Sequence, residues 1–586
     1  MKNSNTHLQS CVVSEKLYSA PAPAQHPGNS QFFSRRELLR RAGTTVAGIC
    51  ALDFLSYFSA FGATRPTGKV SARVHDMAKE GEDPHFLVYW YMEGGWESYD
   101  MFSPALTPNN VIHRLPPDKI SDEYYRVLHF GEPHYGIYKE GNIRYGYLAE
   151  GAKPLFPNMA VLSSMDTGEF HSGERLNVHM GSYDYNIQDE RQPDERDVMQ
   201  AFAEVYGRPY VLPNIGWFWW LSDGELNEQQ YTGRRGFYPN LGPIWAHTIY
   251  GGTPANLRQF LLRMHQQSSD VVNRQVEQFT DNISSYLTHD NNMEVVKSYD
   301  SALGVYQNLA ESGRNLSPAL LSGLFQDTVL KEKFKVKPED ELITYTSVNG
   351  NKARTKFTPN ANVQAMMAYE LMRSGLSACF FIESRNIRLF DSHYGRRGLW
   401  SPDRRTPYGM PDQTNIMREN LWEPLNTFVA LLKSTPYKHT GKSLFDLTTI
   451  VITSEFGRTI SGDVSSIQKD VKLTDAQKDQ MIYDQDVSQH WKVTGAAFLG
   501  GKVRGNLQIG GAGPKTLLPM PIMPDGSIDM AYDQLTGELI TGRAKSPLSF
   551  IPDHGDVYST ALYLSDIDPK GHGRNNRPPL KMIKRI

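Results

Sequence analysis

The sequence predicts an α/β protein with a mostly parallel β-sheet and helices on both faces of that sheet. Several apolar runs rich in β-branched and aromatic residues show no polar alternation, which is typical of strands buried on both faces. Segments with apolar residues at helical spacing lie between these runs. Strands that alternate with helices along a chain are usually connected in parallel, and the helices then cover the sheet.

Five apolar runs are the expected strands, and each ends in glycine or polar residues. They span residues 85–92, 159–164, 378–382, 448–453 and 496–499. Helices are expected over residues 363–374 and 421–433, the first ending at Gly375. Ligands of open α/β sheets lie beyond the carboxyl ends of the strands, so the residues after these runs are the candidates for a site.

Three segments depart from this regular order. Residues 253–313 have repeated apolar spacing and predict a long helical insertion, whereas residues 461–489 are polar and predict a solvated helical excursion or a mobile lid. Residues 214–220 are strongly aromatic. They could stack on sugar rings, and the alternative is packing in the core.

Length and charge exclude some classes of function. The chain has 586 residues, which we interpret as one large domain with insertions. Its 61 basic and 64 acidic residues give a net charge of -3 without long blocks of one sign. Binding to nucleic acid or to an anionic membrane surface is therefore not expected.

The N-terminus predicts export. The paired arginines in Ser34–Leu39 precede a weakly apolar stretch over residues 42–63, a pattern that resembles a twin-arginine signal, and residues 60–62 offer a cleavage site. We therefore predict a signal over residues 1–62 and one domain over residues 63–586. The expected partner during export is the twin-arginine translocase, and the expected location is periplasmic or extracellular. Asp53 makes the stretch atypical, so an uncleaved anchor stays open.

The cysteine content bears on how the exported domain is stabilised. After cleavage only Cys379 of the three cysteines would remain, so no internal disulfide could form. An exported domain without disulfides must rely on a large core, which more than 500 residues can supply.

Candidate metal ligands follow the expected strands. Asp100 comes after the glycine pair that ends the first run, and Glu455 directly follows the fourth. Asp391 and His393 are two residues apart, so on extended backbone they point to one side, about 6.6 Å apart. His490 follows the polar excursion. Each residue also has an ordinary structural interpretation, as a salt-linked loop residue or a hydrogen-bonded histidine.

Candidate catalytic residues follow the second and fourth runs. Ser172 is expected at a helix N-terminus, where backbone N–H groups would favour an alkoxide, and a simple N-cap is the alternative. Of His171 and His179, at most one is expected to contact a metal or substrate, because the spacing would separate them by about 12 Å on a helix. Arg458 can aim a planar guanidinium at a tetrahedral oxyanion, or it forms a structural ion pair.

These motifs together resemble a known family. GGWESYDMFSP, LSSMDTGEFHSG, HMGSY, FDSHYG, SEFGRT, QHW with a following GG, and DVYST with ALYLSDID occur in that order. They resemble the exported family called domain of unknown function 1501, over roughly residues 84–568. That family looks like a branch of the alkaline phosphatase and sulfatase superfamily, so the resemblance implies an alkaline-phosphatase-like sheet. By position it implies a nucleophile at Ser172 or a neighbour, and metal ligands at Asp100, Asp391, His393, Glu455 and His490.

Two departures from the superfamily pattern limit the expected metal content. Phe456 follows Glu455 where the superfamily usually has a histidine, and Gln489 stands where the family often has an aspartate. One divalent ion is therefore expected rather than two, and the mixed carboxylate and imidazole set favours Zn or Mn.

The resulting hypothesis is an exported metal-dependent hydrolase of a phosphate or sulfate ester, with a small-molecule or glycan ester as substrate. The alternative is a noncatalytic periplasmic or cell-surface binding protein that retains the fold. A third interpretation is glycan binding through the aromatic segment near Trp217.

Overall fold

The computed structural model describes only part of the chain, and all described residues belong to the larger of two units, Tyr57–Ile586. They are residues 84–103, 138–168, 174, 177–179, 181, 197–207, 210–217, 249–250, 252–267, 318–341, 345–348, 351–354, 359–384, 417–437, 440–458, 471–474, 477, 490–513, 518–534, 536–570 and 577–585. The expected export signal, residues 1–62, lies outside them.

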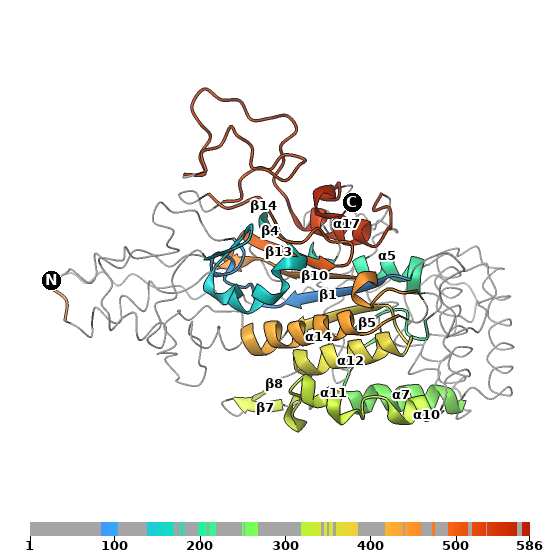
Figure 1. The fold of residues 1–586 in the computed structure, drawn as a ribbon. Coiled ribbons are helices and arrows are strands. Elements are labelled where there is room, and N and C mark those ends of the chain that lie inside the picture. Colours follow the sequence, from blue (N-terminus) through green and yellow to red (C-terminus); the bar gives the residue numbers. More distant parts are fainter. Residues whose placement is uncertain are drawn as a thin grey trace, which may run out of the picture. The chain divides into compact units, whose positions relative to one another are not determined.

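An eight-stranded mixed sheet forms the centre of this unit (Figure 1). The strands run in the order β14 (Leu507–Ile509), β4 (Met159–Asp166), β13 (Val493–Gly500), β10 (Thr448–Ser454), β1 (Phe86–Met92), β9 (Cys379–Ser384), β5 (Ile215–Gly216) and β6 (Ile249–Tyr250). Only β13 is antiparallel to its neighbours. The prediction of a mostly parallel α/β sheet is therefore confirmed.

The three central strands are buried along their whole length, as their unbroken apolar sequences predict. β1 pairs in parallel with β10 on one side and with β9 on the other. In this register Met92 lies opposite both Ser454 and Ser384. The three strands therefore end level with one another, and the residues that follow them meet at one edge.

Helices cover both faces of the sheet (Figure 1). α12 (Ala361–Arg373) and α14 (Glu423–Ser434) pack against each other on one face, while α5 (Val198–Phe202) and α17 (His554–Leu564) pack together on the other. α12 and α14 confirm the two predicted helices. Gly375 ends α12 with a φ of 66°, as the sequence predicts.

The direction of β13 could not be read from its sequence. Residues 496–499 are in a strand, but this strand runs antiparallel between β10 and β4. Periodicity reports burial and not direction. The reversal arises because the chain reaches β13 through a two-stranded ribbon at the carboxyl end of β10, formed by β11 (Gly457–Arg458) and β12 (His490–Trp491).

The remaining elements lie outside the eight-stranded sheet and the four helices named above. They are η1 (Ser98–Asp100), β2 (Tyr138–Glu140), β3 (Ile143–Tyr145), η3 (Tyr147–Asn158), η4 (Ala203–Gly207), α7 (Pro254–Gln267), α10 (Pro318–Gly323), α11 (Thr328–Lys333), η5 (Pro338–Glu341), β7 (Tyr345–Val348), β8 (Asn351–Arg354), η6 (Arg418–Trp422), η7 (Phe445–Leu447) and η8 (Lys581–Ile583). Within the described part of the chain, no helix is both long and apolar enough to cross a membrane.

The three irregular segments are described only in part. α7 gives the start of the predicted insertion over residues 253–313, and the rest of it lies outside the described residues. Of the predicted excursion over residues 461–489, only residues 471–474 and 477 are described. Trp217 is fully buried and donates its Nε1–H to the carbonyl of Gly252 at 3.0 Å. Its ring is therefore part of the core and is not presented to a glycan.

Candidate functional site

The candidate site is built where strands β1, β4 and β10 end, at the carboxyl edge of the sheet. Glu455 follows β10, the glycine pair Gly94 and Gly95 follows β1, and Asp166 is the last residue of β4. These segments are far apart in sequence and come together because the three strands are parallel. Sites of open α/β sheets occupy this position.

Glu455 is fully buried and is held by the end of β1. Its Oε2 accepts a hydrogen bond from the Tyr91 hydroxyl at 2.8 Å, and its Oε1 accepts from the Gly94 N–H at 2.9 Å. The Ser454 hydroxyl lies 3.3 Å from Oε2. Each carboxylate oxygen has two lone pairs, so these bonds orient the group without excluding a metal.

The turn after β1 has a conformation that requires glycine. Gly94 and Gly95 have φ angles of 115° and 77°. A Cβ atom on Gly95 would lie 2.3 Å from the ring of Phe456. The group that lies against this turn is therefore the Phe456 side chain of the SEFGRT motif.

Arg458 is fully buried and fastens the same turn. Its Nε donates to the Gly95 carbonyl at 3.0 Å, and its Nη2 donates to the Gly94 carbonyl. Its guanidinium also lies 5.5 Å from the centre of the Phe456 ring. Neither of these bonds is the ion pair expected as the structural alternative, because both acceptors are backbone carbonyls. Stabilisation of an oxyanion by Arg458 stays a prediction.

His490 is half-buried and lies beside the SEFGRT motif. It pairs with Arg458 across the β11–β12 ribbon, and its ring packs 4.3 Å from the Phe456 ring. The ribbon therefore brings the SEFGRT and QHW motifs together although about thirty residues separate them. Contact of His490 with a metal stays a prediction.

Most of the predicted site lies outside the described residues. These residues are Asp391, His393, His171 and Ser172, and the side chain of Asp100, the last residue of η1, is also outside. Within the described ranges, no three His, Cys, Asp or Glu residues lie close enough together to hold a metal ion. The predicted five-ligand set is therefore not tested as a set.

The structure adds a histidine to the site, His554, which no sequence motif had indicated. His554 is the first residue of α17, and its Nε2 lies 2.9 Å from the backbone carbonyl of Glu455. A carbonyl oxygen only accepts, so this Nε2 carries the hydrogen. Burial lowers the pKa of His554. A neutral imidazole with a protonated Nε2 has Nδ1 as a hydrogen-bond acceptor.

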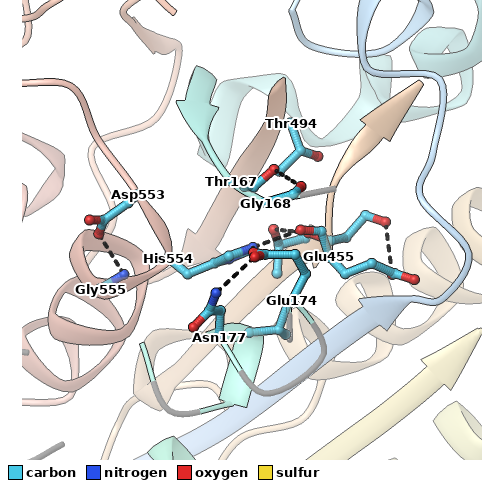
Figure 2. A network of polar contacts seen from close by, with 12 residues as sticks. Thr167, Gly168, Glu174, Asn177, Glu455, Thr494, Asp553, His554 and Gly555 are labelled. Atoms are coloured by element: carbon cyan, nitrogen blue, oxygen red, sulfur yellow. Dashed lines mark hydrogen bonds and ion pairs between the residues drawn. The ribbon is translucent and has the colours of Figure 1, made fainter. Parts of the chain in front are cut away.

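Glu174 lies next to His554 and is also buried. Its Oε1 accepts a hydrogen bond from Asn177 Nδ2 at 2.9 Å, and its Oε2 lies 3.7 Å from His554 Nε2 (Figure 2). Burial raises the pKa of Glu174 to about 7, and the charges of Glu455 and Asp166 act in the same direction. Near neutral pH this carboxyl can therefore exchange a proton or bind a cation.

His179 is a core residue. Its side chain is fully buried and stacks on Phe381, with ring centroids 4.4 Å apart, and Tyr91 lies against it at 6.1 Å. Burial lowers the pKa of His179 to about 3, and the nearby His554 contributes to this. The imidazole is therefore neutral at physiological pH. His171 lies outside the described residues, so the expectation that at most one of these two histidines contacts a ligand stays a prediction.

Glu174 and His554 line a pocket of about 260 Å³, which we call the Glu174 pocket. The pocket lies between the segment that follows β4 and the N-terminus of α17 (Figure 2). Its lining residues are Asp166, Thr167, Gly168, Glu174, Asn177, Gly181, Ile551, Asp553, His554 and Arg577.

Part of this pocket had a signal in the sequence. Asp553 and Asp556 are three residues apart and form a capping box at the start of α17. An Asp followed three positions later by an acidic residue is a pattern that indicates the start of a helix. This pattern places His554 at a helix N-terminus. Nothing local indicates that His554 reaches Glu455, because that contact joins residues 99 positions apart.

Comparisons with known proteins identify no family. No family model matches the chain, and no curated protein matches it. Among solved structures, the lipoteichoic acid synthase LtaP from Listeria monocytogenes is similar, with 11% identity over 84% of this chain and 79% of that chain. The TM-score of 0.29 is too low for this likeness to carry an argument. The resemblance to domain of unknown function 1501 therefore rests on the motifs alone.

Proposed function

We propose that the chain is a hydrolase of a phosphate or sulfate ester and uses one divalent metal ion at the carboxyl edge of the sheet. The observation that supports this most directly is Glu455, a buried carboxylate placed at the end of a central strand and oriented by Tyr91 and Gly94. Carboxylate oxygens are ordinary ligands of Zn and Mn in proteins, so a bound ion could use Glu455 as one of its ligands.

The donor types fit a metal such as Zn or Mn. Glu455 offers a carboxylate and His490 an imidazole on the adjoining ribbon, and Asp100, Asp391 and His393 complete the proposed set. A bound ion would polarise the ester oxygen and favour the ionised form of an attacking hydroxyl or water. Ser172 is the proposed nucleophile with His171 assisting it, and Arg458 is proposed to stabilise charge on the transferred group.

One experiment tests the metal and the activity together. Protein purified after export is analysed for bound metal and assayed with p-nitrophenyl phosphate and p-nitrophenyl sulfate. The wild type is expected to carry about one Zn or Mn ion and to cleave one of the two esters. Asp391→Ala and His393→Ala should lose both properties, while Glu332→Ala, at an exposed position of α11, should keep them. Full metal occupancy in both site variants would refute the proposed centre.

The alternative, a noncatalytic binding protein that retains the fold, has one observation in its favour. Arg458 donates to the carbonyls of Gly94 and Gly95, so two of its nitrogen atoms already serve the fold. A protein of this kind would carry the metal and cleave neither ester, and the same experiment therefore separates the two functions.

Export by the twin-arginine pathway is part of the proposal. It is supported by the paired residues Arg35 and Arg36 ahead of a weakly apolar stretch. Replacing both by lysine should retain the protein inside the cell, as measured by fractionation and immunoblotting. Unchanged export of this double variant would show that another pathway, or another signal, is used.

A further inference from the structure

The Glu174 pocket contains hydrogen-bond acceptors that have no donor. Glu174 Oε2, Asn177 Oδ1 and His554 Nδ1 are all buried, and none of them has a hydrogen-bond partner among the described residues. Glu174 and His554 are 6% and 2% exposed, so water reaches them poorly. A buried acceptor without a donor destabilises the folded state, and folded proteins rarely leave several together.

The charges around the pocket are mainly negative. Asp166, Glu174 and Asp553 contribute carboxylates, and Arg577 is the one arginine or lysine among the lining residues. Arg577 donates to Asp553, which also accepts from backbone N–H groups at the start of α17. Burial raises the pKa of Asp166, and the positive charge of Lys492, which does not line the pocket, opposes this effect. Among the described residues that line the pocket, no lysine or arginine is therefore left to pair with the Glu174 carboxylate.

These acceptors disfavour a bound anion and would be satisfied by a hydrogen-bond donor. A phosphate or sulfate group offers only acceptor oxygens when ionised, and would face Glu174 and Asn177 without a hydrogen between them. An ammonium group carries three N–H donors, no acceptor and a positive charge. It therefore matches both the unsatisfied acceptors and the excess of carboxylates, and the pocket is large enough for a small aminoalkyl group.

The position of the pocket links it to the proposed active site. His554 lines the pocket and also bonds the backbone carbonyl of Glu455, so the two sites share a wall (Figure 2). We infer that the Glu174 pocket binds a primary ammonium group on the alcohol part of the substrate, so the substrate is an ester of an amino alcohol. The ester part of this inference rests on the proposed hydrolase function, whereas the ammonium part rests on the pocket alone.

Two matched pairs of probes test the inference. The first pair is 2-aminoethyl phosphate and 2-hydroxyethyl phosphate, which differ only in ammonium against hydroxyl, and their binding to the full chain is measured by calorimetry. The second pair, 2-aminoethanol and 1,2-ethanediol, is followed by ligand-observed NMR and needs no ester site. A charge-assisted hydrogen bond is worth about 1.5–3 kcal/mol, so the wild type should prefer each amine by about tenfold or more.

Glu174→Gln should abolish the preference for both amines because it removes the charge and keeps the shape. Asp166→Asn changes an exposed residue, so it should fold normally and reduce the preference less. Glu332→Gln should leave it unchanged. Equal binding of amine and alcohol by the wild type, or an undiminished preference in Glu174→Gln, would overturn the inference.

The two proposals fail in different ways. Glu174-dependent binding of 2-aminoethanol without cleavage of any ester would refute the hydrolase and support the pocket. Ester cleavage without a preference for the amine would refute the pocket and support the hydrolase.

Discussion

Replacing Glu174 by Gln should make the protein more stable at pH 8 and should change its stability little at pH 4. The carboxyl group is 6% exposed and packs against His554 and Asn177. Burial raises its pKa from 4.5 to about 7. Between these two pH values the unfolded chain releases the proton while the folded chain retains it, so the free energy of unfolding falls as pH rises.

The magnitude follows from the pKa shift. A difference between about 7 and 4.5, at about 1.4 kcal/mol for each pH unit, gives a loss of about 3 kcal/mol that is complete above pH 7. Gln has nearly the same shape, keeps an oxygen for Asn177 and carries no charge at any pH. The variant should therefore exceed the wild type by about 3 kcal/mol at pH 8 and match it at pH 4.

Urea denaturation at half-unit steps from pH 4 to pH 8 measures this difference. Titrating groups that do not interact with Glu174 are common to both proteins, so they cancel in the comparison. Glu332→Gln, at an exposed position of α11, is the control substitution and is measured over the same range. A difference for Glu174→Gln that stays constant with pH would refute the proposed burial of the charge, and a difference of opposite slope would mean that a cation stabilises the ionised form in the folded chain.

Three further predictions concern the core of the site. Gly457→Ala should break the β11–β12 ribbon and cost several kcal/mol in urea denaturation, since its Cβ would lie 1.9 Å from the carbonyl oxygen of Val493; an unchanged midpoint would contradict the packing. Arg458→Lys should cost about 2–4 kcal/mol because one ammonium cannot replace the guanidinium on two carbonyls, and near-neutral stability would argue against that role. Between pH 7.5 and pH 5 the free energy of unfolding should fall by about 2 kcal/mol less in His179→Leu than in the wild type. The neutral imidazole of His179 contributes stability above pH 6.5, and this contribution is lost as pH falls toward 3. Equal pH profiles of the two proteins would refute this prediction.

The central sheet and its edge could be predicted from the sequence because they depend on local patterns. Unbroken apolar runs report burial on both faces, and burial on both faces implies a covered, mostly parallel sheet. From that alone Glu455 could be placed at the carboxyl edge, and it lies there, beside the turn after β1. The direction of β13 could not be obtained in the same way, since strand sequences carry little information about direction.

The Glu174 pocket could not be predicted because its contacts join distant segments. Glu174 belongs to the segment after β4, whereas His554 begins α17. The sequence indicates Ser172, two residues earlier, as the nucleophile, because a helix N-terminus favours an ionised hydroxyl, whereas a glutamate in a first helical turn is common. Only burial distinguishes Glu174 from a surface carboxylate, and burial depends on the tertiary arrangement.

The SEFGRT motif has a structural role that explains why its residue types occur together. Ser454 donates to the Met92 carbonyl and accepts from the Trp96 N–H, at 2.6 and 3.2 Å. Glu455 then accepts from Gly94, Phe456 lies against Gly95, and Arg458 donates to both glycines. The turn after β1 is therefore held by four residues of the motif: Ser454, Glu455, Phe456 and Arg458. Loss of activity in most variants of this motif would therefore report a displaced turn, and would say little about a ligand.

Glu455→Gln separates the structural role of the motif from a ligand role. The amide oxygen can still accept from the Gly94 N–H, and the amide N–H₂ can donate to the Tyr91 hydroxyl, so both hydrogen bonds survive and only the one with Tyr91 reverses its direction. We expect the free energy of unfolding, measured without metal, to change by less than about 1 kcal/mol. Bound Zn or Mn should fall sharply, because a neutral amide is a weak ligand compared with a carboxylate. Unchanged metal content with unchanged stability would show that Glu455 serves only the turn, and the metal would then have to be bound elsewhere.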